Sequence, residues 1–303
     1  MFKIMFGMKI KYGILLAAVS LVSCKESRIS STPKLMEGVT ATDSVVKQEA
    51  VGVDDNNPSS SHLKQILAKK DSVSEGQVKM EKDTGKCYIY LTLDDGPQPP
   101  GTINCKNILE KNQVKATFFM IGEHYSLDKE RRDLADSIEQ NPLFLVGNHS
   151  ETHAFHNRYA TFYKHPEKSI LDFEVAEQKL NLRYKIARLP GCNTWAFDNQ
   201  LKGQSEGFSV AKKLSDLDYS VYGWDVEWPF KNGSTPVKSA TQMVKEVENA
   251  LKNNHTRQPK SVVILAHDRM FGKPQYADSL NKFITTLKGD HRYVFETLEN
   301  YKM

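Results

Sequence analysis

The sequence predicts an α/β fold, either a parallel α/β barrel or a doubly wound sheet, that begins near residue 88. From there on, short β-rich apolar runs alternate with amphipathic stretches of helical length. Titratable side chains follow several apolar runs directly, as they do where the carboxyl ends of parallel strands open onto one face. The first 86 residues show neither feature.

The predicted strands and helices alternate throughout this region. Strands are expected from apolar runs rich in β-branched and aromatic residues at 88–93, 116–121, 143–146, 185–188, 219–224, 261–266 and 293–295. Helices are expected from the amphipathic stretches at 102–112, 127–140, 166–181, 207–217, 236–253 and 275–287. Ser126 is the expected N-cap of the helix at 127–140, and Pro166 suits the first turn of its helix. Repeated strand–helix units of this kind build a mostly parallel sheet.

The N-terminal segment 1–23 has the pattern of a lipoprotein signal peptide. Three lysines precede the apolar run 14–22, which is too short to span a bilayer as a stable helix and fits a signal-peptide core. The run ends in Leu21-Val22-Ser23-Cys24, which resembles a bacterial lipobox and makes Cys24 the expected lipidation site. Cleavage nearby with an incidental Cys24 is the alternative. We therefore expect a protein of the cell envelope, lipid-anchored to a membrane outside the cytoplasm.

Residues 24–86 have the composition of a flexible linker. They are rich in Ser, Thr, Asp, Asn and Gln, contain no aromatic residue after Cys24 and include the loop-forming run 54–61. The chain is thus expected to consist of the signal peptide, a lipid-anchored linker at 24–86 and a catalytic domain at 87–303.

The charge balance argues against a nucleic-acid partner. The chain has 41 Lys and Arg against 37 Asp and Glu, a formal net charge of +4, and no long basic run. Three of the basic residues belong to the signal peptide, which leaves 38 against 37 in the mature chain. A mean hydropathy of −0.51 excludes a protein with several membrane spans. We expect a monomer whose partners are its substrate and, through the lipid, a membrane.

Two short motifs predict a site for a divalent metal ion. His149 and His153 are four residues apart, which would place both imidazoles on one side of a helical turn. Asp94 and Asp95 follow a predicted strand, and a metal bound to one carboxylate relieves their mutual repulsion. Taken alone, the histidines would be a surface pair and the run Asp94–Pro97 a plain turn. Two imidazoles and one carboxylate leave an open coordination position for water, as a catalytic zinc site requires.

Five segments, in order along the chain, resemble the motifs of the polysaccharide deacetylases, carbohydrate esterase family 4. They are Thr92–Pro97, His149–His153, Arg188–Gly191, Asp225 with Trp228, and Leu265–Asp268. The resemblance implies a distorted (β/α) barrel with a mostly parallel set of strands, preceded by the flexible linker. It also implies one divalent metal ion, with zinc as the first expectation.

The resemblance implies roles for the residues that match the first three motifs. Asp95, His149 and His153 would bind the metal. Asp94 would be the general base that takes a proton from the attacking water, and Arg188 would pair with Asp94 and set its pKa.

It likewise implies how the remaining residues complete the reaction. His267 would be the general acid that protonates the departing amine, and Asp225 would hold His267 in position. The backbone N–H of Gly191 would stabilise the oxyanion. Leu265 and Trp228 would contact the substrate; of the three tryptophans in the chain, Trp228 is the one expected to form a pocket wall.

The sequence departs from the family pattern in ways that leave two points open. Gly191 stands where an aromatic residue commonly sits, which would open one wall of the sugar site. The segment Asp225–Trp228 is shorter than usual, so that either Asp225 or Glu227 would meet His267.

The cysteines beyond Cys24 allow at most one internal disulfide. They are Cys87, Cys105 and Cys192, and the pair considered is Cys105 with Cys192, because both follow motifs of the active face.

These expectations define one leading function and several alternatives. The leading hypothesis is a metal-dependent hydrolase that removes N-acetyl groups from a GlcNAc-containing polysaccharide such as peptidoglycan, a chitin-like polymer or an exopolysaccharide. The alternatives are an O-acetyl esterase on polysaccharide, a catalytically inactive lipid-anchored glycan-binding protein, and an imide or ureide amidohydrolase on the same fold. Retention of Asp94 and His267 argues against an inactive protein, since binding alone needs neither group.

Overall fold

The computed structural model describes residues 85–301. The expected signal peptide, the lipidation site Cys24 and nearly all of the expected linker lie outside the described residues. None of the helices within 85–301 has the length and apolar character that a membrane span needs.

The described residues form a ten-stranded, mostly parallel sheet and a separate two-stranded ribbon. The strands are β1 (Cys87–Gly96), β2 (Ala116–Met120), β3 (Phe144–Asn148), β4 (Ile186–Ala187), β5 (Thr194–Phe197), β6 (Gln200–Gly203), β7 (Ser220–Val221), β8 (Val226–Glu227), β11 (Ser261–His267) and β12 (Tyr293–Phe295), with β9 (Phe230–Lys231) and β10 (Thr235–Pro236) in the ribbon. The sheet order is β6-β5-β7-β4-β3-β2-β1-β11-β8, with β12 beside the start of β1. Only the pairs β5–β6 and β5–β7 of this sheet are antiparallel.

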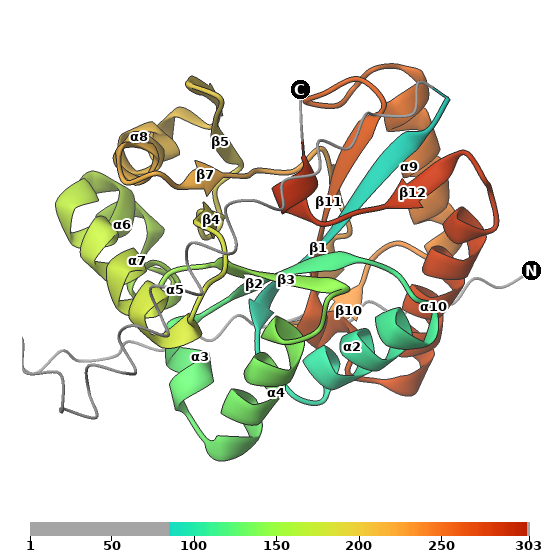
Figure 1. Cartoon of the computed structure of the whole chain (residues 1–303), viewed down its shortest axis with the longest axis horizontal. Coiled ribbons are helices and arrows are strands. Elements are labelled where there is room, and N and C mark those ends of the chain that lie inside the picture. The colour runs from blue at the N-terminus through green and yellow to red at the C-terminus, as the bar shows by residue number, and fades with distance from the viewer. Residues whose placement is uncertain (1–84, 302–303) are drawn as a thin grey trace, which may run out of the picture. The chain divides into compact units, whose positions relative to one another are not determined.

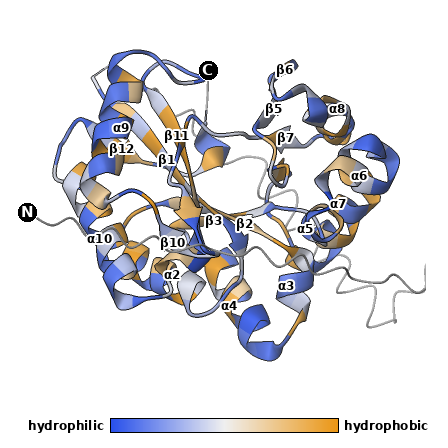
Figure 2. Ribbon diagram, turned by 180° about the vertical axis from the view of Figure 1, so that it is seen from behind, coloured by the Kyte–Doolittle hydropathy of each residue, from blue (hydrophilic) through white to orange (hydrophobic). Residues whose placement is uncertain are grey.

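The helices lie along the outer side of the curled sheet, which forms an open half-barrel (Figure 1). They are α2 (Gly101–Lys111), α3 (Gly122–Ser126), α4 (Lys129–Glu139), α5 (His153–Asn157), α6 (Tyr159–Lys164), α7 (Pro166–Leu180), α8 (Phe208–Asp216), α9 (Ala240–Lys252) and α10 (Pro274–Lys288), with short 3₁₀ turns η1 (Ser205–Gly207), η2 (Asp268–Phe271) and η3 (Leu298–Asn300). The helices turn polar residues outward, and apolar residues gather along the sheet (Figure 2). The predicted distorted (β/α) barrel is therefore confirmed, and the alternative of a doubly wound sheet is not adopted.

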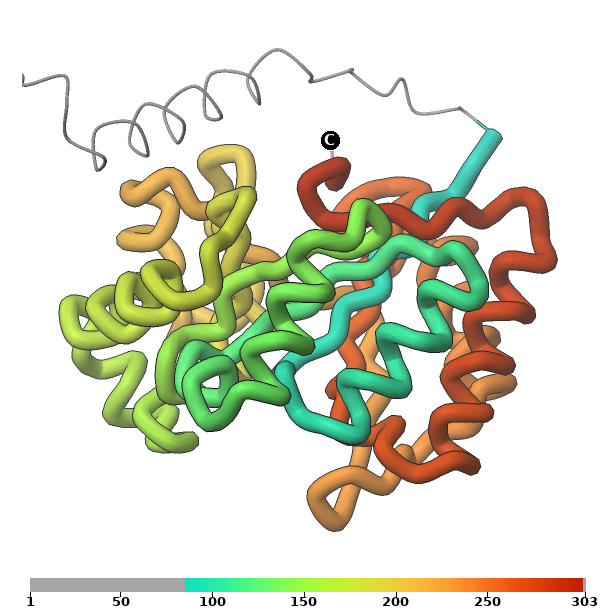
Figure 3. The backbone as a smooth tube through the Cα atoms, turned by 60° about the horizontal axis from the view of Figure 1, so that its bottom comes forward, coloured from blue at the N-terminus to red at the C-terminus, as the bar shows by residue number. Residues whose placement is uncertain are grey.

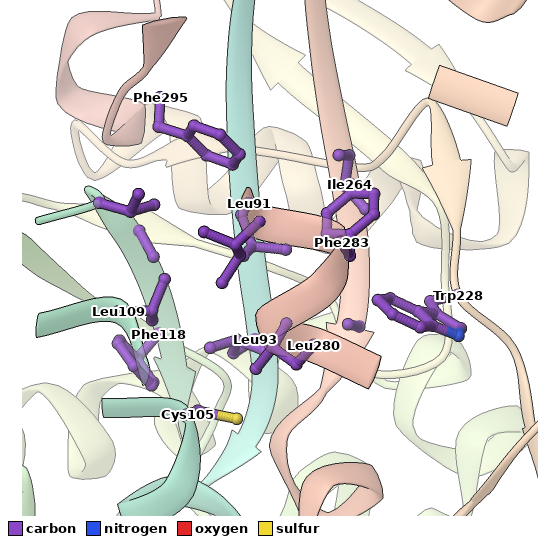
Figure 4. Close-up of a cluster of buried hydrophobic side chains, with 14 of the residues drawn as sticks. Leu91, Leu93, Cys105, Leu109, Phe118, Trp228, Ile264, Leu280, Phe283 and Phe295 are labelled. Atoms are coloured by element: carbon purple, nitrogen blue, oxygen red, sulfur yellow. The ribbon is translucent and has the colours of Figure 1, made fainter. Parts of the chain in front are cut away.

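The first strand lies at the centre of the sheet because it pairs with strands from both ends of the described chain. Figure 3 shows β1 running beside β11, from the C-terminal part of the chain. Side chains alternate along β1: Ile89 and Leu91 belong to the core under the helices, where Leu91 lies near Phe283 of α10 (Figure 4), whereas Tyr88 and Tyr90 face the inside of the half-barrel. This alternation determines which face of β1 carries the polar residues at its end.

Several element boundaries differ from the predicted ones for local reasons. Helix α4 begins at Lys129, because the side chain of Asp128 and not that of Ser126 caps it, accepting a hydrogen bond of 2.9 Å from the backbone of Arg131. The prediction for Ser126 was wrong, since this residue ends α3. Helix α9 begins after a capping box at Ser239.

Candidate active site

The two adjacent aspartates face the same cavity because β1 contains a bulge between them. Asp94 lies on the inward face with Thr92, as the two-residue period of a strand requires. The register with β2 then shifts, and Asp95 adopts a positive φ of 75° before Gly96. Without this irregularity, Asp95 would point to the opposite face of the sheet. Both carboxylates are 2% exposed.

His149 and His153 reach the cavity from two different local structures. His149 follows β3 directly, and the segment 153–157, α5, is a left-handed turn in which φ ranges from 49° to 63°. The side chain of Thr152 caps this turn by accepting a 3.0 Å hydrogen bond from the backbone of Phe155. The prediction that one ordinary helical turn carries both imidazoles was wrong, because residue spacing does not determine the handedness of a turn. The two rings nevertheless meet, with centroids 5.1 Å apart.

Asp95, His149 and His153 form a cluster with the geometry of a metal-binding triad. One nitrogen or oxygen from each residue lies within 4.8 Å of the other two. Oδ1 of Asp95 is 3.5 Å from Nε2 of His149 and 3.3 Å from Nε2 of His153. This buried oxygen has no hydrogen-bond partner, which is costly unless a cation binds it. A carboxylate with two imidazoles suits zinc and other divalent transition metals, so the residues present fit such an ion.

The outer nitrogen of each imidazole is held by a neighbouring acceptor. Nδ1 of His149 donates to the backbone carbonyl of Arg188 at 2.9 Å, and Nδ1 of His153 donates to Oδ1 of Asn157 at 2.6 Å. Because these acceptors fix the proton on Nδ1, the Nε2 lone pairs are directed toward Asp95.

The charges in the triad are strongly coupled. Burial alone would raise the pKa of Asp95, but the neighbouring imidazoles of His149 and His153 outweigh it and hold that pKa well below its usual range. Burial opposes protonation of His149 as well, yet the nearby Asp94 and Asp95 raise its pKa. Burial and the charge of His149 lower the pKa of His153 to about 4.

Arg188 is fully buried behind the carboxylates and forms an ion pair with Asp94. Its Nη1 donates to Oδ1 of Asp94 at 2.9 Å, which is the pairing that the family resemblance implied. The remaining donors bind the backbone carbonyls of Tyr222 and Gly223, and the guanidinium lies 4.4 Å from the ring centroid of Phe119. Because all its partners are fixed, Arg188 holds Asp94 in one orientation.

A cavity of about 510 Å³ opens over these groups. Of the residues predicted from the sequence, its lining includes both aspartates, both histidines, Gly191, Leu265 and His267. Trp224 and Phe230 add aromatic walls that the sequence did not single out. Arg188 and Asp225 are absent from the lining, so they can act only through other residues.

Trp228 does not line the cavity, and its prediction as a pocket wall was wrong. The side chain is fully buried between Phe271 and Phe283, with ring centroids at 5.3 and 5.2 Å. Figure 4 shows Trp228 among the buried apolar side chains of this core. Its indole N–H donates to the backbone carbonyl of Lys238 at 2.9 Å. The wall is formed instead by Trp224, which lies before β8.

His267 ends β11 and lies directly across from Asp94 in the sheet register. Its ring packs edge-on against Phe230, with centroids 4.8 Å apart. Nδ1 of His267 is buried and has no hydrogen-bond partner. Burial lowers the pKa of His267, so its protonated form is a stronger acid than an exposed imidazolium.

Asp225 does not hold His267, which corrects the role that the resemblance implied. Its Oδ1 accepts the backbone N–H of Arg257 at 2.6 Å, and its Oδ2 accepts that of Val263 at 2.8 Å. Burial raises the pKa of Asp225 to about 6. Glu227 lines the cavity but makes no hydrogen bond to His267 within the described residues. Asp225, directly before β8, is thus joined to β11 and to the loop before β11.

Arg269 contributes to the site although it lies outside the motif segments. Its Nη2 lies 3.1 Å from Oδ2 of Asp95, and its guanidinium lies over the ring of Phe230 at 4.8 Å. The ion pair occupies Oδ2 and leaves Oδ1 of Asp95 facing the imidazoles. The sequence feature that could have identified Arg269 as a site residue is its position two residues after His267.

The cysteines within the described residues are all free, so the disulfide considered between Cys105 and Cys192 is absent. Cys105 is buried in the core between α2 and the sheet, and the thiol of Cys192 lies 3.3 Å from the hydroxyl of Thr194.

The chain is similar to known proteins over the region that contains the triad. Residues 81–191 match the sequence model of the family described as polysaccharide deacetylase. The match ends at Gly191, before the segment that carries His267.

Two relatives and one solved structure extend the similarity. The chain is 26% identical to a chitin disaccharide deacetylase from Vibrio alginolyticus, over 71% of each chain. It is 29% identical to a peptidoglycan-N-acetylglucosamine deacetylase from Bacillus cereus, over 59% of each chain. The crystal structure of the catalytic domain of a peptidoglycan N-acetylglucosamine deacetylase from Eubacterium rectale covers 73% of this chain and 93% of its own, with a TM-score of 0.50 and 22% identity. This last similarity supports the fold.

Proposed function

We propose that the chain is a metal-dependent hydrolase that removes N-acetyl groups from a GlcNAc-containing polysaccharide, and the match of residues 81–191 to the polysaccharide deacetylase family model supports this. The bond broken is then a non-peptide carbon–nitrogen amide bond, with water as the second reactant. The observation that supports this most directly is the triad of Asp95, His149 and His153 beside the Arg188–Asp94 pair in one cavity.

Asp95, His149 and His153 would hold one divalent ion, with zinc as the first candidate. When bound, such an ion would polarise the acetyl carbonyl and make water acidic enough to ionise near neutral pH. The protein's own contribution is to direct one oxygen and two nitrogens at that position and to hold them with Arg269, Arg188 and Asn157.

Asp94 and His267 would divide the proton transfers between them. Asp94 keeps one oxygen on Arg188, and its Oδ2 lies 3.7 Å from Nε2 of His149, beside the metal position. It would accept a proton from the attacking water. His267, across the cavity, would donate a proton to the amine nitrogen as the carbon–nitrogen bond breaks, leaving acetate and a free amine.

Gly191 and Leu265 would form the part of the cavity that contacts the acyl group. The backbone N–H of Gly191 is the proposed donor to the oxyanion, and Leu265 supplies an apolar surface.

The proposed location is the cell envelope, where the lipid on Cys24 would anchor the protein to a membrane outside the cytoplasm as a monomer. The support is the lipobox-like sequence alone. Replacing Cys24 by Ala should move the protein from the membrane fraction to the soluble extracytoplasmic fraction and abolish incorporation of labelled fatty acid. Unchanged membrane attachment would exclude this anchor.

The decisive experiment measures acetate release from peptidoglycan, chitooligosaccharides and acetylated xylan in parallel. We expect release from at least one N-acetylated substrate, loss of activity with a chelator, recovery on adding zinc, and none with Asp94→Asn. Release from acetylated xylan alone would indicate an O-acetyl esterase. No release from any substrate by the metal-loaded protein would leave a glycan-binding role.

A further inference from the structure

A buried carboxylate that the proposed reaction does not use lies behind the left-handed turn 153–157. Asp172, on α7, is 8% exposed, and no Lys, Arg or His of the described residues forms an ion pair with it. Both of its oxygens bind Thr152 instead: Oδ1 accepts the hydroxyl at 2.9 Å and Oδ2 accepts the backbone N–H at 3.2 Å. A buried charge is costly unless hydrogen bonds satisfy it, so these contacts compensate for its burial.

The hydroxyl of Thr152 connects this carboxylate to the turn. An ionised carboxylate only accepts hydrogen bonds, so the single hydroxyl proton of Thr152 is directed toward Asp172. The hydroxyl oxygen is then free to accept the backbone N–H of Phe155 at 3.0 Å. If the hydroxyl proton pointed at Phe155 instead, two donors would face each other. Asp172 therefore keeps the cap of the turn in its accepting orientation.

The turn needs support from outside because its backbone conformation is unfavourable for its sequence. All five residues of 153–157 have φ between 49° and 63°, and none of them is glycine. L-residues resist such a succession unless the surrounding structure holds it. His153 opens the turn and contributes Nε2 to the triad, so the position of its imidazole depends on this backbone remaining left-handed.

The backbone next to Thr152 is attached to the same part of α7. The backbone N–H of Glu151 donates to the carbonyl of Asp172 at 3.0 Å. The side-chain amide of Asn148 donates to the carbonyl of Phe173 at 2.8 Å. The segment between the two histidines of the triad is thus fastened to α7, and Asp172 contributes to this with its backbone and its side chain.

We infer that Asp172 is a positioning residue for the proposed metal ligand His153 and acts through Thr152. It lies outside the five motif segments and does not line the catalytic cavity, so it would touch neither the ion nor the substrate. The inference rests on the proposed metal site and is independent of which glycan is the substrate. Without Asp172, the turn loses the orientation of its cap, and the imidazole of His153 is less often in place for a cation.

Replacing Asp172 by Asn is the most direct test because it changes a single oxygen into an amino group. An amide has one acceptor atom, so it can serve the hydroxyl or the N–H of Thr152 but not both. We expect the affinity for zinc to fall about tenfold, the lower end of the effect of removing a group that supports a metal ligand. Competition with a chromogenic chelator on the full chain measures it.

Two further variants separate the position of the turn from the loss of charge. Glu174→Gln is the matched control: it also removes one negative charge from α7, but Glu174 forms no hydrogen bond to 149–157 in the described structure. Its zinc affinity should stay within about twofold of the parent's. Thr152→Val removes the hydroxyl without changing the charge and should lower zinc affinity as Asp172→Asn does. The double variant should lose much less than the product of the two single effects, because both residues act through one contact.

Hydrogen exchange tests the position of the turn in the absence of metal. In metal-free Asp172→Asn, the backbone amides of the turn should exchange about tenfold faster than in the parent, whereas those of β1 should be unchanged. The amides to follow are those of Phe155, His156 and Arg158, which donate hydrogen bonds within the turn and its cap. Adding zinc should restore their protection, since a bound ion would fix His153 again.

The outcomes separate this inference from the proposed function. Equal zinc affinities of Asp172→Asn and Glu174→Gln would overturn the inference. Faster exchange throughout β1 and α7 would overturn it as well, because Asp172 would then serve the fold as a whole. Weaker zinc binding with faster exchange confined to the turn would support it, even if no glycan released acetate. If the parent bound no zinc, the proposed metal site and this inference would both be refuted.

Discussion

The two sides of the catalytic cavity differ in what holds their side chains. The side with the proposed metal ligands, here called the ligand side, consists of Asp94, Asp95, His149 and His153, with Arg188 buried behind them. The side with the proposed proton donor, here called the proton-donor side, consists of Trp224, Phe230 and His267. On the ligand side both imidazoles donate from Nδ1 to fixed acceptors, whereas Nδ1 of His267 has no partner and the ring is held by packing on Phe230. A metal ligand benefits from a fixed tautomer, but a group that must gain and lose a proton is hindered by a permanent acceptor.

Removing one histidine from each side should give the largest and most different effects. His149→Ala should lose bound metal and all activity. His267→Ala should keep the metal and lower kcat about 10²- to 10⁴-fold, the usual contribution of a general acid. Bound metal is measured by elemental analysis and kcat by acetate release. Loss of metal from both variants would remove the distinction between the two sides.

Substitutions of Trp228, in the core, and of Trp224, on the proton-donor side, should affect stability and substrate binding respectively. Trp228→Ala should lower the free energy of unfolding by about 3–5 kcal/mol, because it empties a site in the core. Trp224→Ala should change the KM with a much smaller loss of stability, because this residue lines the cavity. Urea unfolding and substrate titration of both variants provide the comparison. A larger KM change for Trp228→Ala would contradict the structure.

Asn157, which holds His153, and Phe230, which packs against His267, should affect metal affinity and kcat separately. Asn157→Gly removes the acceptor of His153 and tolerates the positive φ of 63°, so metal affinity should fall about 10- to 100-fold. Phe230→Leu removes the ring against His267 and should lower kcat without changing metal affinity. Competition with a chromogenic chelator measures the affinity. Equal metal affinity in Asn157→Gly and the parent would show that this hydrogen bond does not orient the ligand.

Asp268, buried beside His267, should make stability depend on pH. Burial raises the pKa of Asp268 to about 8, so its contribution to stability is present at low pH and is lost as the pH rises toward that value. Asp268→Asn does not titrate. The free energy of unfolding of Asp268→Asn, relative to that of the parent, should therefore increase by on the order of 2 kcal/mol from pH 5 to pH 7. The upper limit for one titrating group is about 1.36 kcal/mol per pH unit. Urea unfolding of the metal-free proteins at both values measures this, and a constant difference would refute it.

The smallest effect is expected for Asp225, whose carboxylate binds backbone amides. Asp225→Asn should cost about 1 kcal/mol of stability through one lost hydrogen bond and leave the pH profile of acetate release unchanged. A shifted profile with a large drop in kcat would show that Asp225 orients His267 during turnover. Thermal unfolding and the pH dependence of kcat are the two measurements.

The sequence alone was sufficient for the elements with strong periodicity and for the ligand side of the cavity. Long apolar runs identified β1, β2 and β11. The adjacent aspartates and paired histidines pointed to the residues that the fold brings together as a candidate metal-binding triad. The two-residue strands β4, β7 and β8 carry too little pattern for their limits to be predicted.

Only the tertiary structure decided which side chains around these elements reach the cavity. The bulge at Asp95 and the left-handed turn that begins at His153 depend on backbone angles that residue spacing does not encode. Trp228 and Trp224 are four residues apart in one short segment, and the packing of α10 against the sheet buries the first while the second lines the cavity. The sequence determined which chemical groups are present and which strand each of them follows, because a strand is recognised from the pattern of neighbouring residues. Their partners and exposure are set by contacts between distant segments, so they required the folded chain.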